Sequence, residues 1–344
     1  MIVSVSRKRV VLVTGANGEM GQGLIREIAQ RSPEYAIVAL DIRELDESLS
    51  KYCHSKIVGD VLDERLLERL VSEYEIHSIL HLAALLSTRA EFTPETAHAV
   101  NVGGTLNLLK LAVEQSRWHG RPVQFLLPSS IAVYGLPDLA TKRAFNNIAE
   151  HQWNMPTTMY GCNKLYTEHL GRYYSRHYRQ LAVEEDKHGV DFRSIRFPGL
   201  ISAFTVPHGG TSDYGPEMIH SAAQDLDYAC FVRDDTRIPF MAMPDAIDSI
   251  LGLMEAPSSA LSQCVYNISA YNPSAADFYK RIQRVYPKCE VRFEPDVRRQ
   301  AIVDSWPESV DDSKARADWG HAPKYDFERT FDEYLIPNIK QLYA

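Results

Sequence analysis

The chain has 344 residues, 45% hydrophobic and 24% charged, which is the composition of an ordinary soluble globular protein with a sizeable core. Its formal net charge of −8 argues against binding to nucleic acid or to an anionic membrane surface. We expect no membrane span and no signal peptide, because no apolar run approaches about 18 residues and the first strand begins early. The five cysteines are scattered and form no C-x-x-C pair, which suits free thiols in a reducing compartment and predicts a cytoplasmic protein.

The first predicted strand, residues 10–13, runs directly into a glycine-rich turn and a helix that extends to about residue 29. The turn places Gly15, Gly18 and Gly21 three residues apart. Residues without a Cβ let the backbone approach a pyrophosphate, and the free N–H groups of the helix point at the anion. This pattern predicts a dinucleotide-binding turn.

A second strand, residues 36–40, ends on Asp41, twenty residues after Gly21. An acidic residue at this place accepts hydrogen bonds from the adenosine ribose and repels a 2′-phosphate. The predicted cofactor is therefore NAD rather than NADP.

The alternation of strand and helix continues with a strand at 55–58, a helix at 64–74 and a strand from Ser78. Asp60 follows the first of these strands and is expected at the adenine edge, whereas Ala83 and Ala84 end the last one where a cofactor approaches closely. The predicted cofactor-binding residues in this half are Gly15, Asn17, Gly18, Glu19, Met20, Gly21, Asp41, Ile42, Arg43, Asp60, Val61, Leu82, Ala83 and Ala84. His77 and His81 have an i,i+4 spacing, but they lie in and just before a strand and do not converge there, so no metal site is predicted.

A long helix is expected from Pro94 to about residue 114, and Asn101 interrupts its apolar pattern. Taken alone, a single Asn in a helix predicts a solvated position. The following strand, residues 124–127, ends in Ser129 and Ser130. Side chains at the carboxyl end of such a strand lie where open α/β sheets bind ligands.

Tyr160 and Lys164 open an apolar-striped helix, and residues four apart share one face with about 5–6 Å between Cβ atoms. A phenol with an ordinary pKa of about 10 can act as a base if a neighbouring cation favours the phenolate. Tyr52 and Lys56 have the same spacing in a short polar connection, so the spacing alone is weak. The upstream strands and the glycine turn favour the pair at 160 and 164.

Beyond this helix, residues 179–188 form a charged surface insertion, residues 191–196 a strand, and residues 207–216 a mobile loop. The alternation of strand and helix then breaks down. We predict an α/β fold, a Rossmann-type doubly wound parallel sheet with a smaller mixed C-terminal substrate lobe. Residues 1–200 would form the NAD-binding domain, and 201–344 mainly the substrate-binding lobe, with some segments returning to the first domain.

Over residues 10–199 these features resemble the extended short-chain dehydrogenase/reductase superfamily. In that resemblance Ser130 takes the place of the active-site serine. Tyr160 is similar to the catalytic base, and Lys164 to the partner that also holds the nicotinamide ribose. Asn101 then corresponds to the helix position that orders a water touching the lysine. The implied catalytic residues are Ser130, Tyr160, Lys164 and Asn101. The resemblance also adds Ser129, Tyr160, Lys164, Phe197 and Pro198 to the predicted cofactor-binding residues.

Three stretches of the second half resemble the short-chain type of L-threonine 3-dehydrogenases. They are residues 192–202, residues 209–214 (Gly-Gly-Thr-Ser-Asp-Tyr) and residues 304–320, which hold Ser-Trp-Pro and Asp-Trp-Gly. The resemblance implies a homodimer that oxidises the C3 hydroxyl of L-threonine to 2-amino-3-oxobutanoate with NAD. The implied substrate-binding residues are Ser129, Ser130, Tyr160, Gly199, Gly210, Thr211 and Ser212. The chain departs from the family at His208, Ser212, Gly215-Pro216 and, inside the Tyr160 motif, Cys162-Asn163.

Two other functions fit the same front half. A nucleotide-sugar epimerase or dehydratase would hold its diphosphate substrate with basic side chains. Residues 189–279 contain no lysine and only four arginines, namely Arg193, Arg196, Arg233 and Arg237, which disfavours that substrate. A non-catalytic NAD-sensing protein is disfavoured because Ser130, Tyr160 and Lys164 are all intact.

Overall fold

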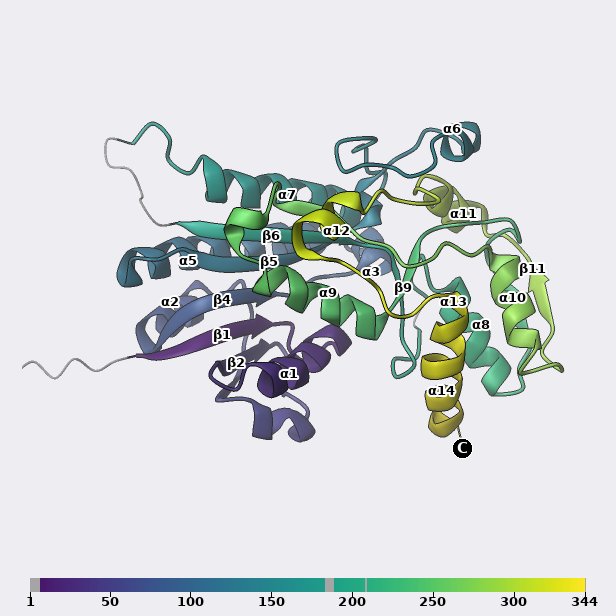
Figure 1. Cartoon of the computed structure of the whole chain (residues 1–344), viewed down its shortest axis with the longest axis horizontal. Helices are drawn as coiled ribbons and strands as arrows, with labels where there is room; N and C mark the ends of the chain where they lie inside the picture. Colours follow the sequence, from purple (N-terminus) through teal and green to yellow (C-terminus); the bar gives the residue numbers. More distant parts are fainter. Residues whose placement is uncertain (1–6, 183–188, 208, 344) are drawn as a thin grey trace, which may run out of the picture.

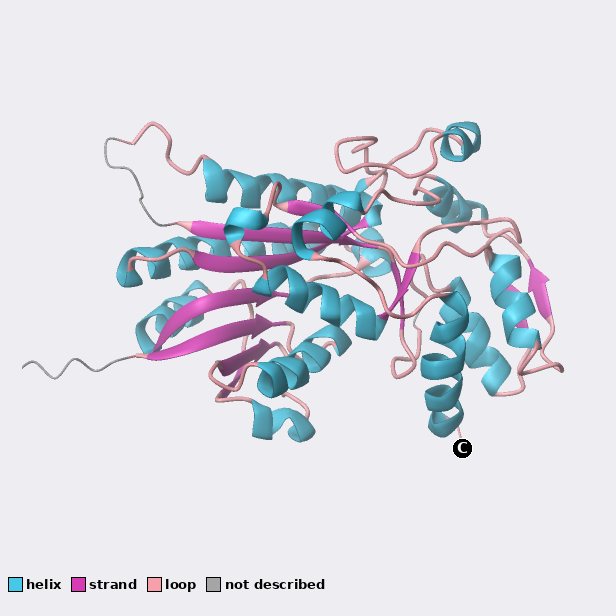
Figure 2. Ribbon diagram, in the orientation of Figure 1, coloured by secondary structure: helices cyan, strands magenta, loops and turns pink. Residues whose placement is uncertain are grey.

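Seven parallel strands form one sheet at the centre of the larger lobe, in the order β10-β6-β5-β4-β1-β2-β3 (Figures 1 and 2). The computed structural model describes residues 7–182, 189–207 and 209–343. The strands are β1 (Lys8–Thr14), β2 (Ala36–Asp41), β3 (Ser55–Val58), β4 (Tyr74–His81), β5 (Val123–Ser130), β6 (Val190–Phe197) and β10 (Val265–Asn267). The strand order reverses between β1 and β4, and this reversal is the point at which open α/β sheets bind ligands. The predicted doubly wound fold is confirmed.

Helices cover both faces of this sheet, which explains why its strands are continuous apolar runs. Buried residues of α1 (Glu19–Arg31) and α9 (Met243–Glu255) belong to the core cluster on one face. Buried residues of α2 (Glu64–Glu73), α5 (Thr105–His119) and α7 (Met159–Arg176) belong to the second cluster on the other face. The short connecting elements are η1 (Glu47–Tyr52), α3 (Ser87–Phe92), η3 (Ile131–Val133), α6 (Leu139–Ala144) and η4 (Ser258–Ala260).

The helix expected as one piece from Pro94 is divided into three. It consists of α4 (Pro94–His98), the π-helical turn η2 (Ala99–Gly104) and α5. Asn101 lies in the π-helical turn, and such turns are frequent at functional sites. Helix α5 ends at Gly120, whose φ of 69° is the left-handed conformation of a helix C-terminus.

The second half of the chain builds the smaller lobe, seen at the right of Figure 1. Two parallel strand pairs lie there, β7 (Gly199–Ile201) with β9 (Phe240–Ala242) and β8 (Tyr228–Cys230) with β11 (Val291–Phe293). The helices of this lobe are α8 (Tyr214–Ala223), α10 (Ala275–Gln283), α11 (Val297–Asp304), α13 (Phe327–Arg329), η5 (Thr330–Leu335) and α14 (Ile336–Leu342). Helix α12 (Ser313–Trp319) packs instead against β10 of the larger lobe. The predicted end of the loop at residue 216 is wrong, because α8 already begins at Tyr214. His208, in the same loop, lies outside the described residues.

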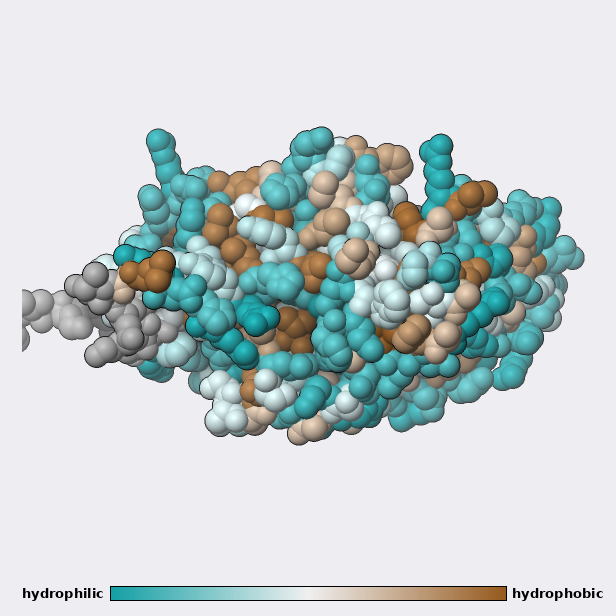
Figure 3. Space-filling model, turned by 90° about the horizontal axis from the view of Figure 1, so that it is seen from above, coloured by the Kyte–Doolittle hydropathy of each residue, from teal (hydrophilic) through white to brown (hydrophobic). Residues whose placement is uncertain are grey.

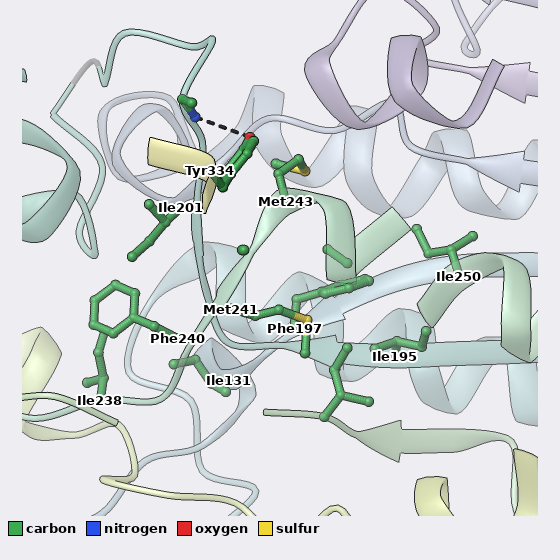
Figure 4. Close-up of a cluster of buried hydrophobic side chains, with 14 of the residues drawn as sticks. Ile131, Ile195, Phe197, Ile201, Ile238, Phe240, Met241, Met243, Ile250 and Tyr334 are labelled. Carbon is green, nitrogen blue, oxygen red and sulfur yellow. Dashed lines mark hydrogen bonds between the residues drawn. The ribbon is translucent and has the colours of Figure 1, made fainter. Parts of the chain in front are cut away.

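The two lobes share one apolar core. Figure 4 shows Ile195 and Phe197 of β6 beside Met241 of β9 and Ile250 of α9. Strand β10 joins the central sheet beside β6, so residues after 201 contribute to both lobes. On the face shown in Figure 3, apolar side chains form small separate groups among hydrophilic ones, which is ordinary for a protein surface.

Candidate active site

The glycine turn after β1 is shaped for close backbone approach. Gly15 has a φ of +66°, and a Cβ there would lie 2.6 Å from the Ala83 nitrogen. A Cβ on Gly21 would lie 2.6 Å from the Gly15 carbonyl oxygen. In the described chain no side chain caps α1, and its first helical hydrogen bond runs from the Gln22 amide to the Gly18 carbonyl over 2.9 Å. The amides of the residues between them are therefore the free donors of a helix N-terminus, which fits a diphosphate.

Asp41 ends β2 beside this turn, as the sequence predicts. Its carboxylate accepts the Asn17 amide at 2.9 Å and the Arg43 amide at 3.0 Å, so it is oriented by the backbone. The neighbouring Ile42 is 69% exposed. A carboxylate fixed at this place fits the ribose of NAD and opposes a 2′-phosphate.

The remaining predicted cofactor residues lie at the same edge of the sheet or close to it. Asp60 is exposed and accepts the Leu62 amide at 2.9 Å, whereas Val61 is buried under η2. The Leu82 amide donates to the Thr14 carbonyl at 3.1 Å, which holds the residues after β4 against the glycine turn. Phe197 is the register partner of Ser130 across β5 and β6, and both Phe197 and Pro198 are buried.

Glu19 differs from the other residues of the turn. Its carboxylate accepts hydrogen bonds from the Ser202 hydroxyl and from the Thr205 hydroxyl. Both partners follow β7, so Glu19 ties the first turn of α1 to the smaller lobe. Met20 is half-buried and packs on the core.

Helix α7 starts where the sequence predicts and carries Tyr160 in its first turn. Thr158 caps it by accepting the Gly161 amide at 3.1 Å. A Cβ on Gly161 would lie 2.1 Å from the Ala132 carbonyl oxygen, so η3 packs directly on the first turn of α7. Ser130 caps η3 through the Ala132 amide at 3.1 Å. This packing brings Ser130 and Tyr160 to one place.

Lys164 is buried one turn further along α7. Its ammonium donates to the Pro128 carbonyl at 2.7 Å and lies 5.5 Å from the Tyr160 ring centroid. Burial lowers the pKa of Lys164 to about 8, and the Glu168 carboxylate opposes that shift. Burial also raises the pKa of Tyr160 above its ordinary value. Desolvation thus outweighs the expected effect of the cation, and the neutral Tyr160 phenol is favoured over the phenolate.

The two serines at the end of β5 have different surroundings. The Ser129 hydroxyl donates to Glu168 at 2.5 Å, and Ser129 is buried. Ser130 is half-buried at the edge of the sheet. Because the Ser129 hydroxyl is bonded to Glu168, Ser130 is the better candidate of the two for contact with a substrate.

Asn101 is buried with 4% of its surface exposed, so the expectation of a solvated position is wrong. Its side chain accepts the Leu85 amide at 2.8 Å and donates to the Leu85 carbonyl at 3.0 Å. It also donates to Asn163 of α7 at 3.3 Å. The residues after β4 fold over the π-helical turn, and their backbone supplies polar partners that a helix pattern cannot reveal.

His81 takes no part in a metal site. Its ring nitrogens contact the Thr14 hydroxyl at 2.8 Å and the Thr105 hydroxyl at 3.1 Å, and Thr105 donates to the Asn101 carbonyl at 2.6 Å. Burial, and secondarily the charge of Lys164, lower the pKa of His81 to about 3. It is thus a neutral bridge between the glycine turn and η2. Within the described ranges no group of His, Cys, Asp and Glu could hold a metal ion.

The predicted substrate loop is pinned from two sides. The Thr88 hydroxyl of α3 donates to the Gly209 carbonyl at 2.9 Å, and Arg299 of α11 donates to the Gly210 carbonyl at 2.8 Å. The Gly210 amide is bound to the Asp213 carboxylate at 2.6 Å, so it is not free for a ligand. Thr211 is buried and Ser212 half-buried. Gly199 lies in β7, where a Cβ would lie 2.7 Å from the Phe240 ring, so this position supports packing.

Several of these residues escape sequence reasoning. Helix α3 with Thr88 is not predicted from the sequence, and Arg299 stands in no recognisable sequence pattern. For Glu168 a signal does exist, since it follows Lys164 by four residues and so shares its helix face. No helix in the described part of the chain has the length and apolar character needed to cross a membrane.

The comparisons with known proteins identify the class. The model of the NAD dependent epimerase/dehydratase family matches residues 11–269. The chain belongs to this family.

Its relatives narrow the identification further. The mitochondrial L-threonine 3-dehydrogenase of Bos taurus is 35% identical over 325 residues, which are 92% of this chain and 79% of that protein. An uncharacterised epimerase/dehydratase of Staphylococcus saprophyticus is 37% identical over 92% of each chain. Among solved structures, a monomeric L-threonine 3-dehydrogenase of metagenomic origin is 35% identical with a TM-score of 0.83, covering 97% of this chain and 100% of that one. The predicted resemblance to the L-threonine 3-dehydrogenases is confirmed.

Proposed function

We propose that this chain is an NAD-dependent dehydrogenase that oxidises the C3 hydroxyl of L-threonine. The observation that supports the proposal is the packing of η3, which Ser130 caps, on the first turn of α7, which carries Tyr160. Lys164 of the same helix is bonded to the Pro128 carbonyl, two residues before Ser130. The similarity to L-threonine 3-dehydrogenases over almost the whole chain supports the substrate.

The chain would hold NAD with the amides of the α1 N-terminus and the Asp41 carboxylate. When bound, NAD supplies the acceptor for the hydride that leaves C3. Tyr160 removes the proton of the C3 hydroxyl, and Ser130 donates to the oxygen and orients it. The carbon thereby loses a hydride and the oxygen a proton, so the product is 2-amino-3-oxobutanoate.

Lys164 sets the range of pH in which this chemistry works. Its positive charge favours the Tyr160 phenolate, and it must keep its proton to do so. Because burial lowers the pKa of Lys164 to about 8, we expect kcat to fall as the pH rises above about 8 and Lys164 loses its proton.

We assign recognition of the substrate carboxylate to the hydroxyls of Thr211 and Ser212. The Gly210 amide donates to the Asp213 carboxylate, so it stabilises the loop conformation and does not itself bind the substrate. The Thr88 and Arg299 contacts already hold this loop in place, and its cover over the substrate would exclude water from the reacting atoms.

An epimerase or dehydratase is the second candidate, because the family model and the Staphylococcus saprophyticus relative carry that description. In such an enzyme NAD is reduced and reoxidised within one turnover, so NADH would not accumulate. The described Arg193 and Arg196 are both buried in β6 and bonded to the protein, which leaves few cations for a sugar diphosphate.

The deciding experiment mixes purified protein with NAD and L-threonine and follows NADH absorbance. UDP-sugars in place of threonine, and NADP in place of NAD, are the parallel controls. A threonine-dependent rise that is abolished in Tyr160→Phe, with NAD binding retained, supports the dehydrogenase. Turnover that persists in Tyr160→Phe contradicts the proposed base, and conversion of a UDP-sugar without NADH supports the second candidate.

We further propose that residues 1–200 serve mainly to bind NAD and residues 201–344 mainly to bind substrate. The five cysteines are free, which is consistent with the proposed cytoplasmic location. The proposed homodimer would use α5 and α7, whose exposed positions include Tyr166 and Tyr173.

A further inference from the structure

Glu168 lies one turn after Lys164 on α7 and is buried, with 3% of its surface exposed. The two side chains hold neighbouring residues at the end of β5. Lys164 donates to the Pro128 carbonyl at 2.7 Å, and Glu168 accepts the Ser129 hydroxyl at 2.5 Å. The next residue is Ser130. One face of α7 thus fixes the strand end that presents the active-site serine.

Arg196 of β6 holds the Glu168 carboxylate in place. Its guanidinium donates through Nε at 2.8 Å and through Nη2 at 2.6 Å, which is a two-point contact. Arg196 also donates to the Glu150 carbonyl at 2.8 Å and lies 4.9 Å from the Tyr134 ring. Ser129 and Arg196 are register partners across β5 and β6, so sheet and helix meet at this carboxylate.

A buried ion pair of this kind is weak evidence for stability, because desolvation of both charges offsets their attraction. Its place directly behind the proposed catalytic residues points to another role. We infer that Glu168 is a positioning residue that fixes Ser130 relative to Lys164 and supplies the negative charge that keeps Lys164 protonated. This inference rests on the proposed function of the site.

The charges around Lys164 support the inference that Glu168 keeps Lys164 protonated. On α7 it is flanked by Tyr160 and Glu168, on β4 it faces His81, and on β6 lies Arg196. His81 is neutral, since burial and the Lys164 charge lower its pKa to about 3. Burial lowers the pKa of Lys164, and the Glu168 carboxylate is the group that opposes this shift. Loss of that carboxylate should therefore leave Lys164 deprotonated at a lower pH.

A measurement that needs no substrate tests the electrostatic part. Lysine labelled with ¹³C at Cε is followed by NMR as the pH rises, and the Lys164 signal is assigned by its absence from Lys164→Met. In Glu168→Gln we expect the pKa of Lys164 to fall by about 1 relative to the wild-type protein. Glu168→Gln leaves the buried Arg196 charge unpaired, which destabilises the fold. The double variant Glu168→Gln/Arg196→Met removes both charges, and thermal unfolding of the two variants shows how much stability the unpaired charge costs.

Kinetics test the positioning part. With threonine, Glu168→Gln should lower kcat about tenfold or more and move the alkaline limb of the kcat profile to lower pH, with KM little changed. Ser129→Ala is the matched variant, because it breaks one contact to Glu168 and keeps the charge. We expect it to lower kcat without moving the alkaline limb.

The outcomes separate this inference from the proposed function. If the wild-type protein does not oxidise threonine, the proposed function fails, while the Lys164 titration still decides the electrostatic role of Glu168. A folded Glu168→Gln variant with the wild-type Lys164 pKa and alkaline limb would overturn that role. Unchanged kcat in Ser129→Ala would overturn the positioning role.

Discussion

Replacement of Gly21 by alanine tests whether the glycine turn has the shape that a diphosphate requires. The added Cβ would lie 2.6 Å from the Gly15 carbonyl oxygen and 2.7 Å from the Ala16 carbonyl oxygen. Both obstacles are backbone atoms, so no change of rotamer can relieve them. The turn must move away from the first turn of α1, and its amides would no longer converge on one anion.

The size of the effect follows from these distances. Overpacking against atoms that cannot yield costs about 1–3 kcal/mol. If NAD binding restores the original turn, that energy is taken from binding. Since about 1.4 kcal/mol is a factor of ten, NAD affinity should fall roughly 5- to 150-fold.

Gly23→Ala is the matched control in the same helix. There the new Cβ would lie 2.3 Å from Cδ1 of Ile247, the end of a flexible side chain. Rotation of Ile247 relieves the contact, and alanine gains up to about 1 kcal/mol of helix propensity over glycine. We expect its NAD affinity to stay within about threefold of the wild-type value.

Isothermal titration with NAD and thermal unfolding of all three proteins give the answer. Gly21→Ala should bind NAD more weakly than Gly23→Ala and show a smaller rise of Tm on addition of NAD. Wild-type affinity in Gly21→Ala would refute the assignment of this turn to the diphosphate. Equal losses in both variants would show that any added Cβ in α1 is harmful and that the turn has no special role.

Three further predictions concern other parts of the molecule. Asp41→Ser should raise NADP affinity about tenfold, because it removes the carboxylate that repels a 2′-phosphate. Titration with NAD and with NADP measures this change, and an unchanged NADP affinity would contradict the prediction. Because burial lowers the pKa of His81 to about 3, the unfolded chain binds one more proton than the folded chain below pH 6.5, and the free energy of unfolding should fall as the pH is lowered. Between pH 7.5 and 5, His81 contributes about 2 kcal/mol of that loss. Urea unfolding should therefore show a smaller pH dependence of the free energy of unfolding in His81→Asn than in the wild-type protein. An equal pH dependence in the two proteins would contradict the prediction. For the proposed homodimer, sedimentation should give a mass of twice 39.0 kDa. Tyr166→Glu, on the exposed face of α7, should give the monomer mass. A wild-type protein that is monomeric at micromolar concentration would exclude the dimer.

The predictions from sequence hold best where a local pattern dictates backbone geometry. The continuous apolar runs and the glycines predict β1, β2 and the turn between β1 and α1, and the structure has them within a few residues. Thr158, which caps α7, likewise puts the helix start next to Tyr160. Capping, strand alternation and positive φ depend on neighbours in the chain, so they can be read from it directly.

The expectation that Asn101 is solvated, made from the helix pattern alone, fails because its partners come from elsewhere in the fold. A helix pattern assigns a polar residue to the solvent, but the backbone at Leu85 covers this position and satisfies both its donor and its acceptor. The π-helical turn is invisible for the same reason, since it has no sequence rule of its own.

The sequence by itself determined the α/β class, the cofactor turn with Asp41, and the pairing of Tyr160 with Lys164, because each rests on short-range geometry. Only the tertiary structure decided which serine faces the site and what supports it. Ser129 contacts Glu168 across 39 residues, Gly209 contacts Thr88 across 121, and Gly210 contacts Arg299 across 89. Such contacts arise when helices pack on the sheet, and packing depends on the shape of the whole core rather than on any local pattern.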